Sequence, residues 1–215
     1  VAAVKSVSNS LRSLSKYKKN LSLKLLNVFG EWNNFNDQNI KKINLFNNKN
    51  LLEFEFKGFL NSRILYFKIL FNSYFPLKKT LKQNSPDYLI IHLITSVPIL
   101  LFIFNKFQTK LILRISRLPK MNFFRYFLWK LASNKIEYVI CPTKETQNFL
   151  INKNIFTSNK ILFIPDPIID IKKINNLKKV KLNDSIGRPY FLCIGRFTKQ
   201  KNHIFLLNFF KKNSH

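Results

Sequence analysis

Acidic residues are scarce in this sequence: 10 Asp and Glu stand against 37 Lys and Arg among 215 residues, giving a formal net charge of +27. So large an excess of one sign favours an anionic partner such as a nucleic acid, an acidic membrane face or a phosphorylated substrate. Compositional drift is the alternative, because lysine and asparagine are frequent throughout the chain. Apolar residues make up 46% of the sequence, which argues against a disordered protein.

Only two cysteines are present, Cys141 and Cys193, and both lie in apolar runs typical of strands. Neither belongs to a C-x-x-C pair or to a set with metal-ligand spacing. This pattern argues against a disulfide-bonded protein and favours a reduced, cytoplasmic one without a metal site.

No apolar run has the length of a membrane span. The most apolar window, residues 89–104, contains His92, Thr95, Ser96 and Pro98 and is shorter than the ~20 residues that a span requires. Contact with the inner face of an anionic membrane stays open, but it would be peripheral, through Lys, Arg and exposed aromatic side chains.

Apolar runs of strand length alternate with segments of helical periodicity. Strands are expected at residues 21–29, 40–46, 51–57, 88–92, 109–115, 136–141, 161–164 and 190–194. Helices are expected from residue 1, over 61–75, over 76–82, from about 97, around 123–131, over 143–152 and over 201–212. The helix over 61–75 is apolar on several sides and is expected to be buried, with Pro76 beginning the next one. Such βα units in series predict an α/β fold, a Rossmann-like parallel sheet with helices on both faces.

The most informative stretch of the sequence runs from Pro189 to Lys212 and has the pattern of a strand, a loop and a helix. Its predicted strand, residues 190–194, is followed by Gly195, which lets the backbone turn sharply. Arg196 and Lys201 then lie where the predicted helix begins, next to its free N–H groups and positive dipole end. This arrangement predicts a phosphate site at the carboxyl end of a strand, with an ordinary solvated loop as the alternative.

Gly195-Arg196-Phe197 followed by Gln200-Lys201-Asn202 resembles the G-R-[LF]-x-x-Q-K-N segment of family-4 retaining glycosyltransferases of the GT-B fold. The resemblance implies that Arg196 and Lys201, beside Gly195, hold the diphosphate of a nucleotide-sugar. It also implies a co-substrate in place of a bound cofactor, and no metal.

Two further segments carry the resemblance. Residues 87–92 are similar to the D-x-x-x-x-H strand of the family's acceptor domain, which implies that His92 contacts substrate rather than acting as a general base. Residues 164–170 resemble the interdomain I-P-N-P-x-x-D loop, with Asp166 in place of the asparagine and Asp170 at the last position.

Two arginines at the end of the predicted strand 109–115 are further candidates. Arg114 and Arg117 could hold a phosphate group of an acceptor. Solvated charges at a strand end are the simpler alternative.

The resemblance implies an acceptor-side domain over residues 1–174, a Lys/Asn-rich linker over 175–187 and the start of a donor-binding domain over 188–215. The family's first strand, its Gly-Gly loop and its downstream E-x7-E segment have no counterpart here. The chain is therefore expected to be a fragment of a glycosyltransferase and inactive by itself.

The expected function of the parent enzyme is transfer of a sugar from a nucleotide-sugar to a glycan or lipid-linked acceptor. A basic nucleic-acid-binding module is one alternative, although most phenylalanines have core spacing and no nucleic-acid-binding signature is present. A phosphate-binding α/β protein without transferase activity, such as an epimerase of the same fold, is the other.

Overall fold

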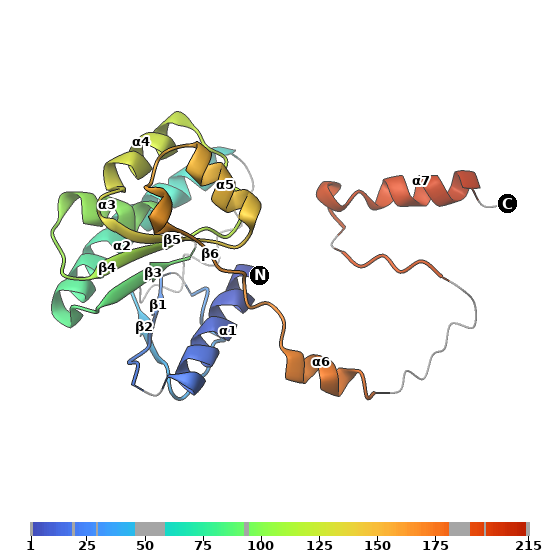
Figure 1. Ribbon diagram of the computed structural model, residues 1–215, viewed down its shortest axis with the longest axis horizontal. Coiled ribbons are helices and arrows are strands. Elements are labelled where there is room, and N and C mark those ends of the chain that lie inside the picture. The colour runs from blue at the N-terminus through green and yellow to red at the C-terminus, as the bar shows by residue number, and fades with distance from the viewer. Residues whose placement is uncertain are drawn as a thin grey trace. The chain divides into compact units, whose positions relative to one another are not determined.

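The computed structural model describes residues 2–18, 20–28, 30–45, 59–92, 95–180, 190–195 and 197–213. The chain divides into two compact units, Val1–Asp170 and Ile171–His215 (Figure 1). The first contains helices α1 to α5 and strands β1 to β6, and the second contains α6 (Ile171–Leu177) and α7 (His203–Asn213). The predicted strand over 51–57 lies outside the described residues.

A four-stranded parallel sheet forms the centre of the first unit. Its order is β3-β4-β5-β6, so each strand pairs with the next one in sequence. The strands are β3 (Tyr88–Ile91), β4 (Lys110–Arg114), β5 (Ile136–Cys141) and β6 (Ile161–Phe163). The connecting helices are α3 (Ser96–Phe104), α4 (Phe123–Ala132) and α5 (Lys144–Asn152). Because crossovers between parallel strands are right-handed, these helices lie along one face of the sheet (Figure 1). The predicted α/β class with a parallel sheet is confirmed, but the helices that connect the strands of this sheet lie on one face and not on both, as had been predicted.

The main core lies between this sheet and its helices. Two residues of β4 and three of β5 are fully buried, and they pack with α3, which is almost wholly enclosed between its neighbours α2 and α4. The fully buried side chains include Ile99, Leu101, Leu111, Leu113, Ile136 and Val139. The opposite face of the sheet is less covered, since Ile90 and Tyr138 are partly exposed on strands where the apolar runs had predicted burial on both sides.

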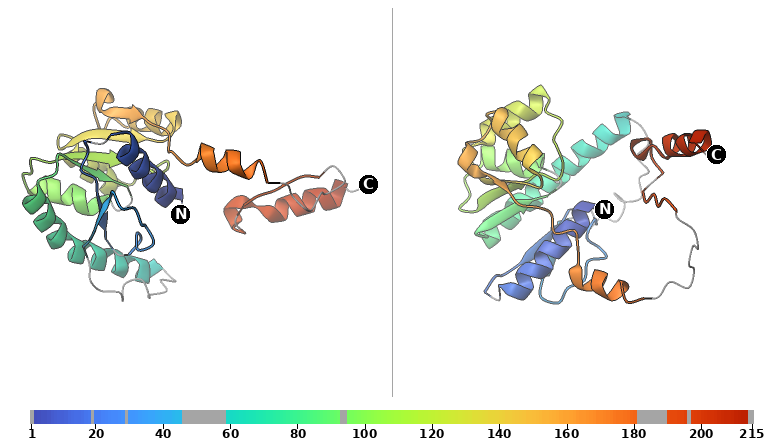
Figure 2. Two further views of the ribbon diagram at one scale, coloured as in Figure 1. Left: turned by 90° about the horizontal axis from the view of Figure 1, so that it is seen from below. Right: turned by 45° about the vertical axis from the view of Figure 1, so that its right-hand side comes forward.

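A second, smaller core supports α1 (Ala2–Tyr17) on a two-stranded parallel sheet of β1 (Lys24–Asn27) and β2 (Lys41–Asn44). Val7 of α1, Leu25 of β1 and Trp32 of the following loop pack together there. The views of Figure 2 show α1 alongside these strands. Within the described residues β1 and β3 each have a partner strand on one side only.

Helix α2 (Phe59–Asn84) corrects two expectations. It runs through Pro76 without ending, because Leu77 and Leu81 in its second half are buried in the main core and hold that half in place. The cost is one helical hydrogen bond, since proline has no N–H to donate. The first half is not a buried helix, since Phe67 and Phe71 are 57% and 67% exposed.

The second unit contradicts the predicted strand at residues 190–194. Tyr190, Phe191 and Ile194 are largely exposed, and the segment forms no strand. A strand needs a neighbour to pair its backbone groups, and the described part of this unit provides none. The helix predicted after it is confirmed as α7. In the described chain no helix is both long and apolar enough to cross a bilayer.

Candidate site at the carboxyl edge of the sheet

Three residues singled out in the sequence lie at or near the carboxyl edge of the four-stranded sheet. His92 follows β3, Arg114 ends β4, and Asp166 lies in the loop after β6. Since carboxyl ends of parallel strands share one edge, the topology brings together groups far apart in sequence. Asp170 lies further along the same loop and is exposed.

Arg114 and Asp166 form an ion pair in which Nη2 of the arginine contacts Oδ1 of the aspartate. The side chains are only 8% and 16% exposed. Arg114 also donates to the hydroxyl of buried Ser6 on α1, over 3.5 Å. Nearby, the Asn9 amide donates to the carbonyl of Pro167 over 2.7 Å. Helix α1, strand β4 and the loop after β6 are thus tied together at this edge.

This pairing corrects the expectation for Arg114. The guanidinium is buried, so it is not a solvated charge, and a carboxylate of the protein already neutralises it. An asparagine at position 166 would leave the buried arginine without a counter-charge.

His92 is held neutral at this edge. The pKa of its imidazole is lowered from 6.5 to about 4, mainly by burial and also by the nearby positive charge of Arg114, against an opposing contribution from Asp166. The backbone carbonyl of His92 accepts a hydrogen bond of 3.0 Å from the hydroxyl of Ser116. Near neutral pH this side chain can exchange hydrogen bonds with a substrate hydroxyl, but it brings no positive charge for a phosphate.

We expect the imidazole of His92 to titrate with a pKa of about 4 in the folded protein. Since the unfolded chain has the ordinary value of 6.5, it binds more protons than the folded chain between these pH values. The stability contribution is therefore complete above pH 6.5 and is lost as the pH falls toward 4. NMR titration measures the pKa, and the signal that is lost in His92→Gln is the one from His92. The same variant is expected to reduce the pH dependence of stability measured by urea unfolding. A His92 midpoint near 6.5 would contradict the burial argument.

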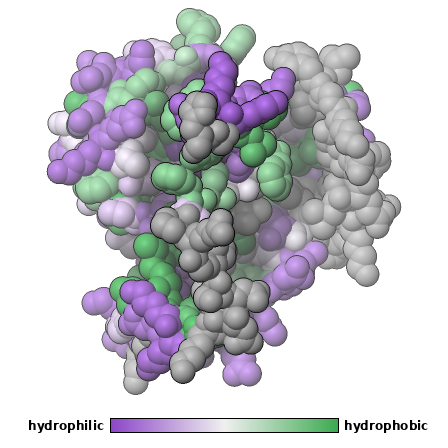
Figure 3. All heavy atoms as spheres, turned by 90° about the vertical axis from the view of Figure 1, so that its right-hand side faces the viewer, coloured by the Kyte–Doolittle hydropathy of each residue, from purple (hydrophilic) through white to green (hydrophobic). Residues whose placement is uncertain are grey.

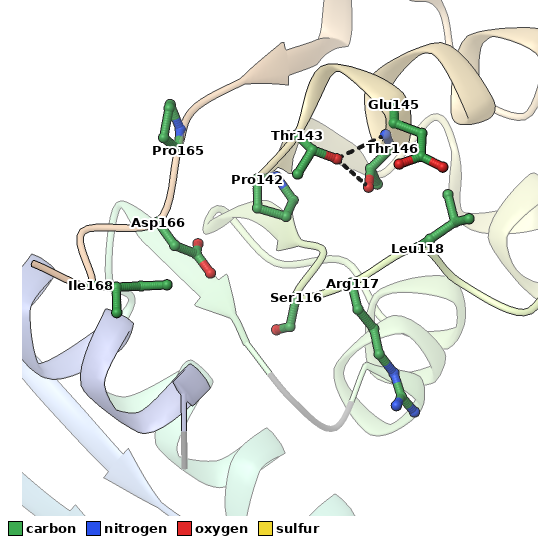
Figure 4. Close-up of a pocket in the computed structure, with 10 residues that line it drawn as sticks. All are labelled: Ser116, Arg117, Leu118, Pro142, Thr143, Glu145, Thr146, Pro165, Asp166 and Ile168. Atoms are coloured by element: carbon green, nitrogen blue, oxygen red, sulfur yellow. Dashed lines mark hydrogen bonds between the residues drawn. The ribbon is translucent and has the colours of Figure 1, made fainter. Parts of the chain in front are cut away.

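Beside the ion pair lies an open pocket of about 450 Å³, drawn in Figure 4. Asp166 and Ser116 point into this region, whereas Arg117 extends away from the other labelled side chains (Figure 4). The remaining lining comes from the loops after β4, β5 and β6 and from the start of α5. These residues are Leu118, Pro142, Thr143, Glu145, Thr146, Pro165 and Ile168.

The start of α5 is built as the sequence predicted. Thr143 is the N-cap, and its hydroxyl accepts a hydrogen bond of 3.1 Å from the backbone N–H of Thr146. Glu145 in the first turn places a carboxylate at the positive end of the helix. The pocket is therefore lined by carboxylates that can accept hydrogen bonds from hydroxyl groups, and by the hydroxyls of Ser116, Thr143 and Thr146. This lining does not suit a phosphate group.

The other predicted site residues belong to the second unit. An added Cβ at Gly195 would lie 3.4 Å from Nε2 of His203 and 3.5 Å from Cγ of Lys201, so the loop folds these residues against one another. A single 3-10 turn, Lys199–Lys201, precedes α7, and Asn202 takes a left-handed conformation between them. Lys201 is exposed directly before the start of α7. Arg196 lies outside the described residues.

Sequence reasoning named His92 and Asp166 but missed the pairing of Asp166 with Arg114. The available signal was a carboxylate in a loop of an otherwise acid-poor chain, together with an arginine at the end of a buried strand. Among the described residues, no group of three or more His, Cys, Asp or Glu side chains could hold a metal ion.

Comparison of the chain with family models, with curated proteins and with solved structures returned no match.

Proposed function

We propose that this chain serves sugar transfer from a nucleotide-sugar, with the loop of the second unit binding the donor diphosphate and the carboxyl edge of the first unit contacting the acceptor. The observation that carries the proposal is the loop from Gly195 to Asn202, whose sequence resembles a family-4 glycosyltransferase segment and leads into α7. Transfer breaks the bond between the sugar and the diphosphate and joins the sugar to an acceptor hydroxyl with retention at the anomeric carbon.

The charge of the second unit supports diphosphate binding. Its described residues contain no Asp or Glu, while Lys201 is exposed just ahead of the first N–H groups of α7. The helix start adds a partial positive charge to the same place. As the diphosphate leaves, its negative charge grows, so preorganised cations lower the energy of the transition state more than that of the ground state. Arg196 and Lys201 are the proposed cations.

The topology of the first unit also supports the proposal. Its four-stranded sheet has the order β3-β4-β5-β6 and is parallel throughout. Ligands of such sheets bind outside the carboxyl ends of the strands, which is where His92 and the pocket beside Asp166 lie. A neutral His92 suits contact with acceptor hydroxyls.

The test is a calorimetric titration of the full chain with UDP, GDP, UMP, GMP and inorganic pyrophosphate at about 0.15 M salt, where long-range attraction is screened. We expect the diphosphates and pyrophosphate to bind about tenfold or more tightly than the monophosphates, since each charge-assisted hydrogen bond contributes about 1.5–3 kcal/mol. Equal binding of all five ligands would contradict a diphosphate site. Tight binding of a single-stranded RNA without any diphosphate preference would favour a nucleic-acid-binding module instead.

A further inference from the structure

Helix α2 turns an apolar face toward solvent. Ile64, Phe67, Phe71 and Phe75 follow one another at spacings of three and four residues, so they share one side of the helix. Their exposed fractions are 53%, 57%, 67% and 70%. The buried residues of the helix lie on the opposite side and are Ile69, Ser73, Leu77 and Leu81. An exposed aromatic stripe of this length is unusual for a helix in water and marks an interaction surface.

The same side of the helix continues as lysines. Lys78, Lys79 and Lys82 follow Phe75 at helical spacing, and together with Phe75 and Gln83 they line a pocket of about 470 Å³. Within the part of the chain that the structure describes, their ammonium groups form no ion pair or hydrogen bond. We name the seven residues Ile64, Phe67, Phe71, Phe75, Lys78, Lys79 and Lys82 the α2 stripe.

Helix α4 provides a contrast. Phe123 and Phe124 at its start are 77% and 81% exposed. The cations beside them are engaged, however, since Arg125 donates to the carbonyl of Lys120 and Lys130 donates to that of Asn154 over 2.8 Å. Exposed aromatic rings alone therefore do not distinguish α2. Its distinguishing feature is the junction of an apolar row with a row of unpaired ammonium groups.

We propose that the α2 stripe docks the protein onto the surface of an anionic lipid bilayer. The aromatic end enters the boundary between headgroups and acyl chains, and the lysines contact lipid phosphates. The helix is long and lies at the periphery of the first unit (Figure 2), and on the face drawn in Figure 3 hydrophobic and hydrophilic side chains are interspersed. This inference goes beyond the proposed function and does not depend on it.

The positive charge of the α2 stripe and of the whole chain favours a lipid bilayer over other binding partners. A second copy of the chain would bring another net charge of +27 against three lysines, which opposes pairing. An apolar groove of a protein would cover the aromatic rings but would leave the ammonium groups without counter-charges. A bilayer with acidic headgroups offers an apolar layer and a negative surface at adjacent depths, which matches both parts of the stripe.

The experiment is flotation of the full chain with vesicles of phosphatidylcholine alone and of phosphatidylcholine mixed with phosphatidylglycerol. We expect binding to the anionic vesicles that weakens with added salt, and little binding to the neutral ones. Phe67→Ser/Phe71→Ser and Lys78→Gln/Lys79→Gln/Lys82→Gln are each expected to lower the partition coefficient about tenfold or more. The matched controls are Phe123→Ser/Phe124→Ser on α4 and Lys135→Gln/Lys144→Gln/Lys153→Gln, which change the same side-chain types elsewhere. Circular dichroism checks that each variant is folded.

A single-residue reporter keeps the test decisive where a double variant fails to fold. Both native tryptophans, Trp32 and Trp129, are buried, so the fluorescence of an added tryptophan can be followed against a constant background. Phe71→Trp is expected to shift its emission to shorter wavelength with anionic vesicles, whereas Phe124→Trp is not. No vesicle binding, equal losses in stripe and control variants, or equal shifts of both reporters would overturn the proposal. So would a dimer or an RNA complex that the stripe variants abolish while vesicle binding persists.

Discussion

Replacing Asp166 with asparagine is expected to lower the free energy of unfolding by about 3–5 kcal/mol, the usual cost of leaving one member of a buried ion pair without its partner. The carboxylate is the acidic partner of Arg114, whose side chain is 8% exposed and whose other hydrogen bond within the described residues goes to a hydroxyl over 3.5 Å. An amide can accept one hydrogen bond from the guanidinium but cannot balance its charge. Urea unfolding followed by circular dichroism at neutral pH measures the difference.

Two further variants separate the pair from a general loss of acidic charge. Glu137→Gln removes the carboxylate that faces Lys110 across 3.2 Å, but both of these side chains are substantially exposed, so the unfolding midpoint should barely move. Arg114→Met combined with Asp166→Asn removes the buried charge altogether and should be more stable than Asp166→Asn alone. Wild-type stability of Asp166→Asn would show that the edge does not depend on the ion pair.

Replacing Arg196 or Lys201 with alanine is expected to weaken binding of inorganic pyrophosphate about tenfold to a hundredfold, the equivalent of about 1.5–3 kcal/mol for a bond between charged groups. The proposed site uses both cations, so the double variant should approach the affinity that the unspecific positive charge of the chain provides. Isothermal titration with pyrophosphate and UDP at two salt concentrations measures the effect.

Net charge makes a matched control necessary for this experiment. At +27 the chain attracts any polyanion, and removing one lysine anywhere reduces that attraction slightly. Lys199→Ala makes the same charge change two residues before Lys201, in the same loop. Affinity that falls equally in Lys199→Ala and Lys201→Ala would indicate unspecific attraction rather than a diphosphate site.

Local pattern was enough to predict most elements of the first unit. The apolar runs at residues 88–92, 109–115 and 136–141 became β3, β4 and β5 with small changes at their ends. Thr143 was identified as a helix cap because its hydroxyl acts on a backbone N–H only three residues away. Parallel pairing followed from the alternation of strand and helix, since neighbouring parallel strands require a long crossover.

Other features depended on neighbours that the local sequence does not reveal. The sequence of α2 is apolar on several sides of the helix, which predicted that the helix is buried. In the structure only one side packs against the core, and Phe71 on the other side is exposed to solvent. Pro76 did not end that helix because packing of Leu77 and Leu81 outweighed one missing hydrogen bond. The apolar run at residues 190–194 did not become a strand, since strand formation requires a paired neighbour.

The sequence by itself determined the parallel α/β class, the order of most elements of the first unit and the basic loop around Lys201, because periodicity, capping and charge act over a few residues. Only the tertiary structure decided that Arg114 is paired with Asp166, that His92 is held neutral beside them and that α2 exposes an aromatic and basic stripe. Burial and long-range electrostatics depend on which distant segments meet at one edge of the sheet, and 52 residues separate Arg114 from Asp166 along the chain.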